Sequence, residues 1–399
     1  MLTDFLIIGG GIIGINIARG LKRIFPDATV LILEKEAECG FHASGRNSGV
    51  LHAGFYYSPD SLKAKFARLG NRYLTHYCES KNIPINKCGK LVVAKNPNDY
   101  TFLDELLKRG VSNEIQLQVV TEKEAKEIEP RVKTCERAIF SPTTATVDPI
   151  AVVAEMKKDA VDEGVHVQCG VRYIKKQKSL IKTSCGVYEA GHVVNASGLY
   201  ADKIARDFGF SEQHRILPFK GLYLYSDEPP GAIRTNVYPV PNLNNPFLGV
   251  HFTVTATGRV KIGPTAIPAL WRENYNGMCN FRLAEFTEIL IRSCGLMALS
   301  TFDFKRLALE EIVKYSRRRM VTLASTLMDG VKQENYLRWG QPGIRAQLID
   351  IKKRRLEMDF VIQGDHRSTH ILNAVSPAFT CSHPFSQHVC QQIKASLSR

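Results

Sequence analysis

The chain opens with an alternation of apolar and polar positions that predicts a strand, a helix and a second strand. Residues 5–8 form a short apolar run of the kind found in buried parallel strands, and residues 29–33 form another. Between them, residues 15–24 carry apolar side chains at helical spacing, which predicts an amphipathic helix. Two strands joined in this way form a βαβ unit, which indicates an α/β fold with a parallel sheet.

A glycine-rich turn between the first strand and this helix gives the unit a candidate function. Gly9, Gly11 and Gly14 fill the spacing G-x-G-x-x-G, and Glu34 follows Gly14 by 20 residues at the end of the second strand. The arrangement suits a dinucleotide, because the turn approaches a pyrophosphate and the carboxylate accepts hydrogen bonds from a ribose. Glu34 disfavours NADP, whose 2′-phosphate would face it, so NAD and FAD remain. Lys35 is a further cofactor-binding candidate beside it.

The same two patterns continue along the chain. Apolar runs predict further strands at residues 90–94, 165–169, 173–176, 180–183, 192–196 and 371–375. Helical spacing and capping signals predict helices at residues 61–80, 121–129, 149–163, 199–208, 281–327 and 383–397. Ser197 and Gly198 form a second strand-to-helix turn, so the nucleotide-binding fold resumes there after an insertion, with Gly198 as a cofactor-binding candidate.

This interleaving predicts two domains. The chain has 399 residues, 44% of them hydrophobic, which is enough for two buried cores. We predict a discontinuous Rossmann-like FAD-binding domain from residues 1–80, 146–212 and 340–399, and a substrate domain of mixed β-sheet and helices from residues 81–145 and 213–339. The class is α/β in the first domain and α+β overall. NAD dehydrogenases usually keep their dinucleotide fold contiguous, so the interleaving favours FAD over NAD.

The charge and the cysteine content limit which partners and metals the sequence predicts. The net charge is +14, but the basic residues are spread out, with local clusters at residues 317–319 and 352–355. Without an aromatic-interleaved basic platform, nucleic acid is not an expected partner. A solvated basic face is the first interpretation and peripheral contact with an anionic membrane the second. Secretion and bilayer-spanning signals are lacking, so we expect a cytoplasmic protein, free or at the inner face of a membrane. The ten cysteines lack ligand spacing, so no metal is predicted.

Residues 42–57, HASGRNSGVLHAGFYY, form a polar, glycine-punctuated loop that runs into apolar and aromatic residues. This loop resembles the second flavin-wrapping loop of the D-amino-acid oxidase superfamily. It is still more similar to the L-2-hydroxyglutarate oxidase/dehydrogenase family, where a near-identical NSGV(I/L)HAG-x-YY follows the dinucleotide fold. The likeness extends over nearly the whole chain through CGKL at 88–91, NASGLYAD at 195–202, LPFKG at 217–221, VYPVP at 237–241, PFLGVHF at 246–252, GIRAQ at 343–347 and NAVSPA at 373–378.

The chain departs from that family at a few positions. Arg46 stands where the family often has His, and Leu222 stands where an acid is common. Phe379 and Cys381 stand where small residues are usual. These departures bear on substrate preference more than on the flavin. The resemblance implies FAD as the cofactor and a 2-hydroxy acid as the substrate.

Two polar segments carry the remaining cofactor-binding candidates. The loop around residues 44–49 can present N–H and hydroxyl groups to the pyrophosphate and the flavin. The segment before the last helix resembles the loop that covers the flavin, where free N–H groups can stabilise negative charge on the reduced ring. A surface loop and an ordinary helix cap at Ser382 are the alternatives. The candidates from the two segments are Ser44, Asn47, Ser48, Gly49, Ser376, Pro377, Ala378 and Thr380.

Oxidising a 2-hydroxy acid with a flavin requires a base for the hydroxyl proton and a cation for the carboxylate. His52 and His251 are the candidate bases, since a neutral imidazole suits proton removal near pH 7. Each is equally well explained as a buried core histidine. Arg345 resembles the arginine that clamps the substrate carboxylate in amino-acid-oxidising relatives, with a structural ion pair as the alternative. Tyr56 and Tyr238 can add hydrogen bonds or only pack.

A dicarboxylate substrate needs a second cation, and spacing does not rank Arg46, Lys220 and Arg272 for that role. We therefore expect FAD-dependent oxidation of L-2-hydroxyglutarate, or of a related 2-hydroxy acid, to 2-oxoglutarate. The hydride would go to flavin N5 and the electrons onward to oxygen or a quinone. An amino-acid or amine oxidase on the same fold is the main alternative. A non-catalytic flavoprotein associated with RNA or a membrane is the second, and the intact flavin loop disfavours it.

Overall fold

The computed structural model describes residues 2–241, 248–299 and 304–398. Pro246 and Phe247 of the PFLGVHF segment lie outside these ranges, as do residues 300–303 of the long helix predicted at 281–327. In the described part of the chain, no helix is both long and apolar enough to span a bilayer.

The N-terminal βαβ unit forms the centre of a mainly parallel sheet, here called the first sheet. Strand β1 (Leu2–Ile8) pairs in parallel with β2 (Val30–Leu33) on one side and with β12 (Gly186–Asn195) on the other. Beyond these, β9 (His166–Gln168) pairs in parallel with β2, and β23 (Ser368–Asn373) with β12. Segments from the beginning, middle and end of the chain therefore share one sheet, as the α/β prediction requires. Three antiparallel strands complete it, namely β10 (Tyr173–Gln177), β11 (Leu180–Thr183) and β22 (Val361–Gly364).

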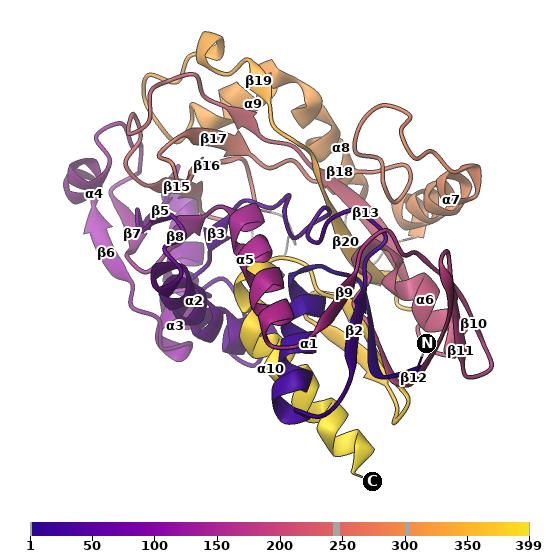
Figure 1. Cartoon of the computed structure of the whole chain (residues 1–399). Coiled ribbons are helices and arrows are strands. Elements are labelled where there is room, and N and C mark those ends of the chain that lie inside the picture. Colours follow the sequence, from indigo (N-terminus) through magenta and orange to yellow (C-terminus); the bar gives the residue numbers. More distant parts are fainter. Residues whose placement is uncertain (1, 242–247, 300–303, 399) are drawn as a thin grey trace.

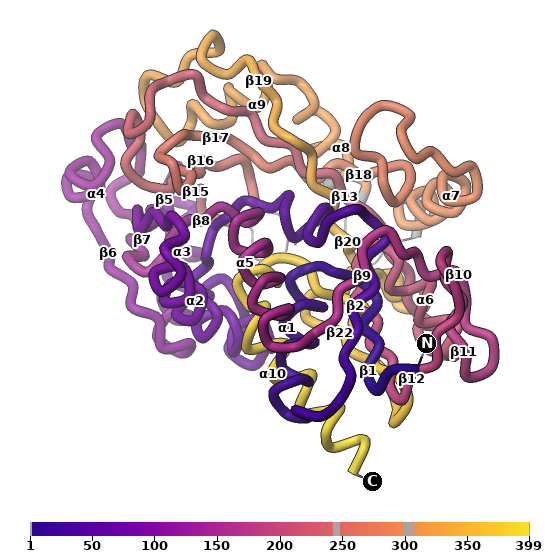
Figure 2. The backbone as a smooth tube through the Cα atoms, viewed as in Figure 1, coloured from indigo at the N-terminus to yellow at the C-terminus, as the bar shows by residue number. Residues whose placement is uncertain are grey.

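Helices cover the first sheet, which explains why its central strands are continuous apolar runs. Helix α1 (Ile12–Ile24) packs against β1 and β2 and also contacts α5 (Pro149–Asp162) and α10 (Ala378–Leu397). Figure 1 shows these three helices beside one another, and Figure 2 shows the indigo tube of α1 next to the yellow tube of α10. Helix α2 (Leu62–Ser80) packs on α10, and α6 (Ala201–Asp207) contacts β12 and β23. Side chains from this layer form one core with Ile7, Ile15, Leu21, Phe385 and Val389 among its members.

A second sheet of eight strands lies in the upper part of the view in Figure 1. Its core includes Leu91, Val237, Phe252 and Met320. Its strands in spatial order are β19 (Arg338–Trp339), β14 (Leu224–Tyr225), β17 (Val260–Gly263), β16 (His251–Val254), β15 (Asn236–Pro239), β5 (Lys90–Val93), β7 (Arg137–Ser141) and β6 (Gln118–Thr121).

Two smaller sheets complete the strand pairing. Strand β13 (His214–Gly221) pairs along its whole length with β20 (Gly343–Asp350), and β18 (Ile267–Pro268) and β21 (Arg355–Leu356) flank that pair. The other small sheet joins β3 (Val50–Leu51), β8 (Ala145–Val147) and β4 (Ile85–Asn86). The strand β3 matters for function because it leads directly into His52.

Several element boundaries differ from the sequence predictions. The helical region predicted at 281–327 is divided, in its described part, into α7 (Leu283–Leu299), α8 (Phe304–Ile312) and α9 (Arg317–Ala324). The break before α9 has a local cause, since the Ser316 side chain accepts a hydrogen bond from the Arg319 N–H and starts a new helix. The helix α3 (Tyr100–Ser112) was not predicted, whereas α4 (Glu122–Ile128) was.

Candidate active site

A cleft of about 950 Å³ runs from the carboxyl ends of β1 and β2 to β20 and the start of α10. Most of the predicted cofactor-binding residues line it. They are Gly9, Gly11, Glu34, Lys35, Ser44, Asn47, Ser48, Gly198, Ser376, Pro377, Ala378 and Thr380. Such a crevice at the carboxyl ends of parallel strands is where α/β sheets bind ligands.

The glycine turn has the backbone geometry that its sequence predicts. Gly9 has φ +114°, a conformation that favours glycine, and a Cβ there would lie 2.5 Å from the Ala196 carbonyl oxygen. Gly14 does not line the cleft. A Cβ on Gly14 would lie 2.0 Å from the Gly9 carbonyl oxygen, so its role is the close packing of α1 on β1. Gly11 is the N-cap of α1, and because glycine has no side chain it makes no capping hydrogen bond to the first turn of the helix.

Glu34 is held at the end of β2 by the backbone. Its Oε2 accepts a hydrogen bond from the Gly10 N–H at 2.8 Å, and its Oε1 accepts one from the Glu36 N–H at 2.9 Å. The carboxylate is buried but lines the cleft, and each oxygen has lone pairs left for a further donor. This is the geometry expected for a ribose-binding carboxylate.

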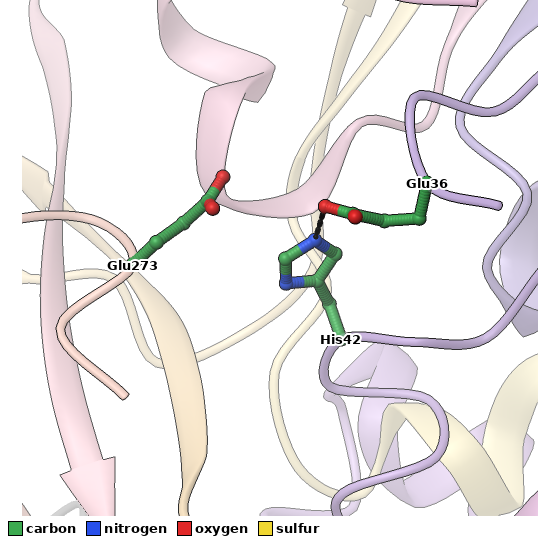
Figure 3. A group of neighbouring side chains, drawn as sticks. All are labelled: Glu36, His42 and Glu273. Atoms are coloured by element: carbon green, nitrogen blue, oxygen red, sulfur yellow. Dashed lines mark hydrogen bonds and ion pairs between the residues drawn. The ribbon is translucent and has the colours of Figure 1, made fainter. Parts of the chain in front are cut away.

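A network of charged groups lies next to Glu34 at the same part of the cleft (Figure 3). Lys35 Nζ donates to Glu273 at 2.7 Å and also pairs with Glu36, and His42 Nε2 lies 2.9 Å from Glu36 Oε1. Burial acts to raise the pKa of Glu36, but the hydrogen bonds from Lys35 and His42 outweigh it and keep that pKa below its usual value. Glu36, His42 and Glu273 approach as metal ligands would, but the Lys35 ammonium binds both carboxylates. The group is therefore best described as an ion-pair network.

The loop at residues 44–49 is anchored to α1 and to itself. Ser44 Oγ accepts a hydrogen bond from the Ile12 N–H at 3.0 Å, in the first turn of α1. Asn47 donates to the Ser44 carbonyl at 2.7 Å and accepts from the Gly49 N–H at 2.8 Å. Gly49 does not line the cleft, because a Cβ there would lie 2.3 Å from the Val147 carbonyl oxygen, so its role is structural.

The helix α10 begins at Ala378, five residues before the predicted start at His383, which was wrong. Ser382 is therefore inside the helix and is not its cap. Pro384 lies inside the helix, in its second turn. The consequence is that Thr380 belongs to the first turn of α10. Its Oγ1 accepts a hydrogen bond from the His52 N–H at 3.1 Å.

Two of the four predicted catalytic residues, His52 and Arg345, line the cleft. His52 follows β3, and Arg345 lies in β20 opposite Phe219. The pKa of His52 is well below its usual value. Burial is the largest cause, and the neighbouring Lys90, His251 and Arg345 lower the pKa further. The His52 imidazole is therefore neutral and its Nδ1 has no hydrogen-bond partner. A guanidinium can bind the carboxylate of a 2-hydroxy acid, and a neutral imidazole beside it can then accept the proton of the neighbouring hydroxyl group.

His251 and Tyr238, the other two predicted catalytic residues, do not line the cleft. Their rings stack at a centroid distance of 3.7 Å, and His251 Nδ1 lies 2.8 Å from the Gly249 carbonyl oxygen. Burial lowers the pKa of His251 to about 3. This geometry favours the interpretation of His251 as a neutral core histidine and leaves His52 as the better candidate base.

The structure separates the three candidates for a second cation. Arg272 is fully buried and forms a bidentate ion pair with Asp202 at 2.7 and 2.9 Å, so its role is structural. The Arg46 guanidinium lies between Phe41 and Tyr275, at 4.5 and 4.4 Å from the ring centroids. Lys220 is buried in β13 and does not line the cleft, although its neighbour Gly221 does.

Sequence reasoning missed two groups near the site. Tyr223 lines the cleft beside Arg345, and Lys90 acts on His52 from β5. Tyr223 carries no sequence signal beyond its place after LPFKG. Lys90 did carry a sequence signal. It begins the apolar run of a predicted buried strand, and a buried lysine is unusual unless it has a partner or a function.

The cleft fits an extended dinucleotide. Gly9 and Gly11 let the backbone approach closely, the start of α1 is free of acidic side chains, and Glu34 is placed for a ribose. The flavin side of such a ligand would reach His52, Arg345 and the start of α10, which line the same cleft. The candidate base His52 and the Arg345 guanidinium would then lie at that end of the cleft.

Comparisons with known proteins show the family of the chain. A model of the FAD dependent oxidoreductase family, DAO, matches residues 4–390. The chain is 36% identical over 394 residues to "L-2-hydroxyglutarate dehydrogenase" of Indibacter alkaliphilus, with 97% of each chain covered. It is 33% identical over 422 residues to the mitochondrial protein of that name of Homo sapiens, covering 98% of this chain and 88% of the human protein.

A solved structure shows the same fold. The L-alpha-glycerophosphate oxidase from Mycoplasma pneumoniae, with FAD bound, superposes with a TM-score of 0.78 at 20% identity, covering 99% of this chain and 95% of that one. The fold, the family match and the relatives all lead to one conclusion. The chain belongs to the FAD dependent oxidoreductase family and, within it, to the family of the L-2-hydroxyglutarate dehydrogenases.

Proposed function

We propose that this protein oxidises the 2-hydroxyl group of L-2-hydroxyglutarate, or of a close 2-hydroxy acid, and releases the 2-oxo acid. The observation that carries the proposal is that His52 and Arg345 line the same cleft as the dinucleotide-binding turn. The names of the relatives support the substrate. FAD is the cofactor, and when bound it supplies a two-electron acceptor for the hydride of the substrate α-carbon.

The chain's own residues have distinct tasks in this reaction. Arg345 binds the carboxylate next to the reacting carbon, and a guanidinium can hold it by two hydrogen bonds, which fixes the orientation of the α-carbon. His52 accepts the proton of the 2-hydroxyl, because its imidazole is neutral and lines the cleft. Thr380 holds the His52 backbone in place.

The oxidation removes two electrons and two protons, so a second substrate must take the electrons from the protein. We propose oxygen or a quinone for this role. A quinone would require contact with a membrane surface, and the region from α7 to α9 is the best candidate. It exposes apolar side chains next to basic ones, among them Leu283, Ile291, Ile312, Val313, Arg317 and Arg318. Sedimentation with anionic vesicles, compared with neutral ones, would test that contact.

A comparison of substrates tests the reaction. The purified protein is mixed, in air and with a soluble quinone as electron acceptor, with L-2-hydroxyglutarate, its D-isomer and a panel of L- and D-amino acids, and both 2-oxo acid and ammonia are measured. We expect 2-oxoglutarate from the L-hydroxy acid alone. Ammonia release from an amino acid would instead establish an amino-acid oxidase on this fold, and absence of any product from L-2-hydroxyglutarate would refute the proposal.

A further inference from the structure

Lys90 is a buried ammonium group with no hydrogen-bond partner. The residue is 0% exposed, and its Nζ contacts no acceptor among the described residues. Three aromatic rings surround the Nζ, with centroids at 4.4 Å for Tyr56, 4.6 Å for Phe55 and 4.9 Å for Tyr238. Ring faces favour a cation but cannot accept its three N–H groups as a carboxylate would. The ammonium therefore lacks its natural counterpart.

Three further buried polar atoms near Lys90 also have no partner among the described residues. They are the phenol oxygens of Tyr56 and Tyr238 and Nδ1 of His52. Buried polar groups in folded proteins almost always have a partner, and an unpaired one is costly. Four such groups in one place indicate an acceptor that the described residues do not supply.

The charges around this cluster define the chemistry of that acceptor. The charged side chains that act on the pKa of His52 and His251 are Lys90, Arg345 and Lys261, all of them basic. Burial lowers the pKa of Lys90 to about 7, so in the free protein the ammonium is only partly retained. An anion would stabilise the protonated form and bind to the other cations as well. The site is therefore complementary to a molecule with more than one negative charge.

We propose that Lys90 binds the distal carboxylate of the substrate, while Arg345 binds the carboxylate next to the reacting carbon. The inference rests on the proposed function and names the residue that selects dicarboxylates within that site. Lys90 does not line the cleft itself, but its flexible four-carbon stem lets the ammonium move toward a carboxylate that enters beside His52. The Tyr56 hydroxyl donates a second hydrogen bond to the same group.

The other candidate cations are less suited to this role. Arg272 is already neutralised by Asp202. Arg46 lines the cleft, but its guanidinium packs on the Tyr275 ring and its Nε donates to the Phe41 carbonyl at 2.8 Å. Lys90 differs from Arg272 because no acid among the described residues pairs with it, and it differs from both because it is the charged group with the largest effect on the pKa of His52.

The test compares two substrates that differ only at the distal group. L-2-hydroxyglutarate carries a carboxylate there, and L-2-hydroxypentanoate carries a methyl group. In Lys90→Met, which keeps an unbranched apolar side chain and removes the ammonium, we expect KM for the dicarboxylate to rise about 10- to 100-fold. KM for L-2-hydroxypentanoate should stay within about twofold of the wild-type value. Tyr56→Phe should raise KM for the dicarboxylate by a smaller factor, about 3- to 10-fold.

The Lys65→Met variant is the matched control, because it removes the same charge from the exposed face of α2. It should leave both KM values unchanged. Bound FAD per chain is measured for every variant, so that a folding defect is recognised by loss of flavin. A folded Lys90→Met protein that discriminates between the two acids as well as the wild type overturns the proposal, and an ordered water is then the partner of Lys90.

Two other outcomes also overturn it. Equal losses for both substrates in Lys90→Met would make Lys90 a residue that positions His52 instead of one that selects the distal group. A loss of discrimination in Lys220→Met, and not in Lys90→Met, would assign the role to Lys220. If wild-type protein oxidises neither hydroxy acid, the proposed function itself fails, which is a different result from the failure of Lys90.

Discussion

Thr380 holds the backbone of His52 in place and links the two ends of the chain at the candidate active site. Thr380 Oγ1 accepts a hydrogen bond from the His52 N–H at 3.1 Å and donates one to the Val50 carbonyl at 3.3 Å. Thr380 lies in the first turn of α10, and His52 follows β3. The placement of the candidate base therefore depends on a helix that is 328 residues further along the chain.

Replacing Thr380 by Val removes this hydroxyl with little change of volume. The buried N–H of His52 would then lack a partner, which costs about 1–3 kcal/mol or shifts the loop. We expect substrate-driven reduction of the flavin to slow by about 10-fold per bound flavin. Stopped-flow absorbance measures this rate, and Thr322→Val on the exposed face of α9 is the control. An unchanged rate would show that His52 does not need the bond.

The packing of α10 on α2 depends on Gly70. A Cβ at Gly70 would lie 1.9 Å from the Thr380 carbonyl oxygen. That carbonyl also lacks the usual helical donor, because Pro384 has no N–H. Gly70→Ala should therefore lower the free energy of unfolding by about 1–3 kcal/mol. Gly295→Ala is the matched control in α7, where a Cβ meets no atom within 4 Å and alanine favours the helix. Urea unfolding measures the free energy of unfolding of both variants. Equal stabilities would contradict the close packing of α10 on α2 at Gly70.

The outline of the fold could be predicted because its signals are local. The apolar runs at β1 and β2, the glycine turn and the Asp148 cap of α5 all depend on residues close in sequence. The start of α10 could not be predicted in this way. Its first turn contacts Gly70 and His52, which are distant in sequence, whereas the local cap signal of Ser382 pointed to a later start.

Glu34 should be required for retention of FAD. Its carboxylate holds the Gly10 and Glu36 N–H groups and faces the cleft, so Glu34→Ala removes both the ribose acceptor and the support of the turn. We expect FAD affinity to fall about 10- to 100-fold. Equilibrium dialysis or fluorescence titration of the apoprotein gives the dissociation constant. Glu38→Ala is the control, because it removes an exposed acid four residues after Glu34, and this variant should bind FAD normally. Undiminished affinity in Glu34→Ala would count against the ribose contact.

Arg345 should be required for the substrate and not for the flavin. Arg345→Met removes the guanidinium that we propose for the reacting carboxylate, so kcat/KM should fall at least about 100-fold. The flavin content should stay at the wild-type level. Steady-state kinetics with L-2-hydroxyglutarate tests this, with the exposed Arg338→Met as the control. Wild-type kinetics in Arg345→Met would refute the clamp.

The buried ion pair of Arg272 and Asp202 should support stability. Burial acts to raise the pKa of Asp202, but Arg272 outweighs it and holds that pKa below its usual value. The unfolded chain therefore takes up the proton first as pH falls. The stabilisation from Asp202 is complete at pH values above the pKa of an aspartate in the unfolded chain, about 3.9. It is lost as the pH falls through the lower pKa of Asp202 in the folded protein. Asp202→Asn leaves Arg272 uncompensated and should cost about 3–5 kcal/mol at pH 7. Urea unfolding at pH 7 measures the loss, and a loss below 1 kcal/mol would contradict the assignment.

The candidate site was only partly accessible from the sequence. His52, Arg345 and the glycine turn belong to segments whose residue types indicate their chemistry. The burial of Arg272 against Asp202, the stacking of His251 on Tyr238 and the isolation of Lys90 depend on how distant strands and helices pack. A sequence gives the types of charged residues, but only the fold shows which of them are already neutralised.

Anaerobic titration of the purified holoprotein tests the central claim most directly. L-2-hydroxyglutarate is added in steps while the visible absorbance of the bound flavin is followed. We predict complete bleaching after one equivalent, with one 2-oxoglutarate formed per flavin, and no bleaching by the D-isomer. A flavin that stays oxidised in excess L-2-hydroxyglutarate would contradict the account.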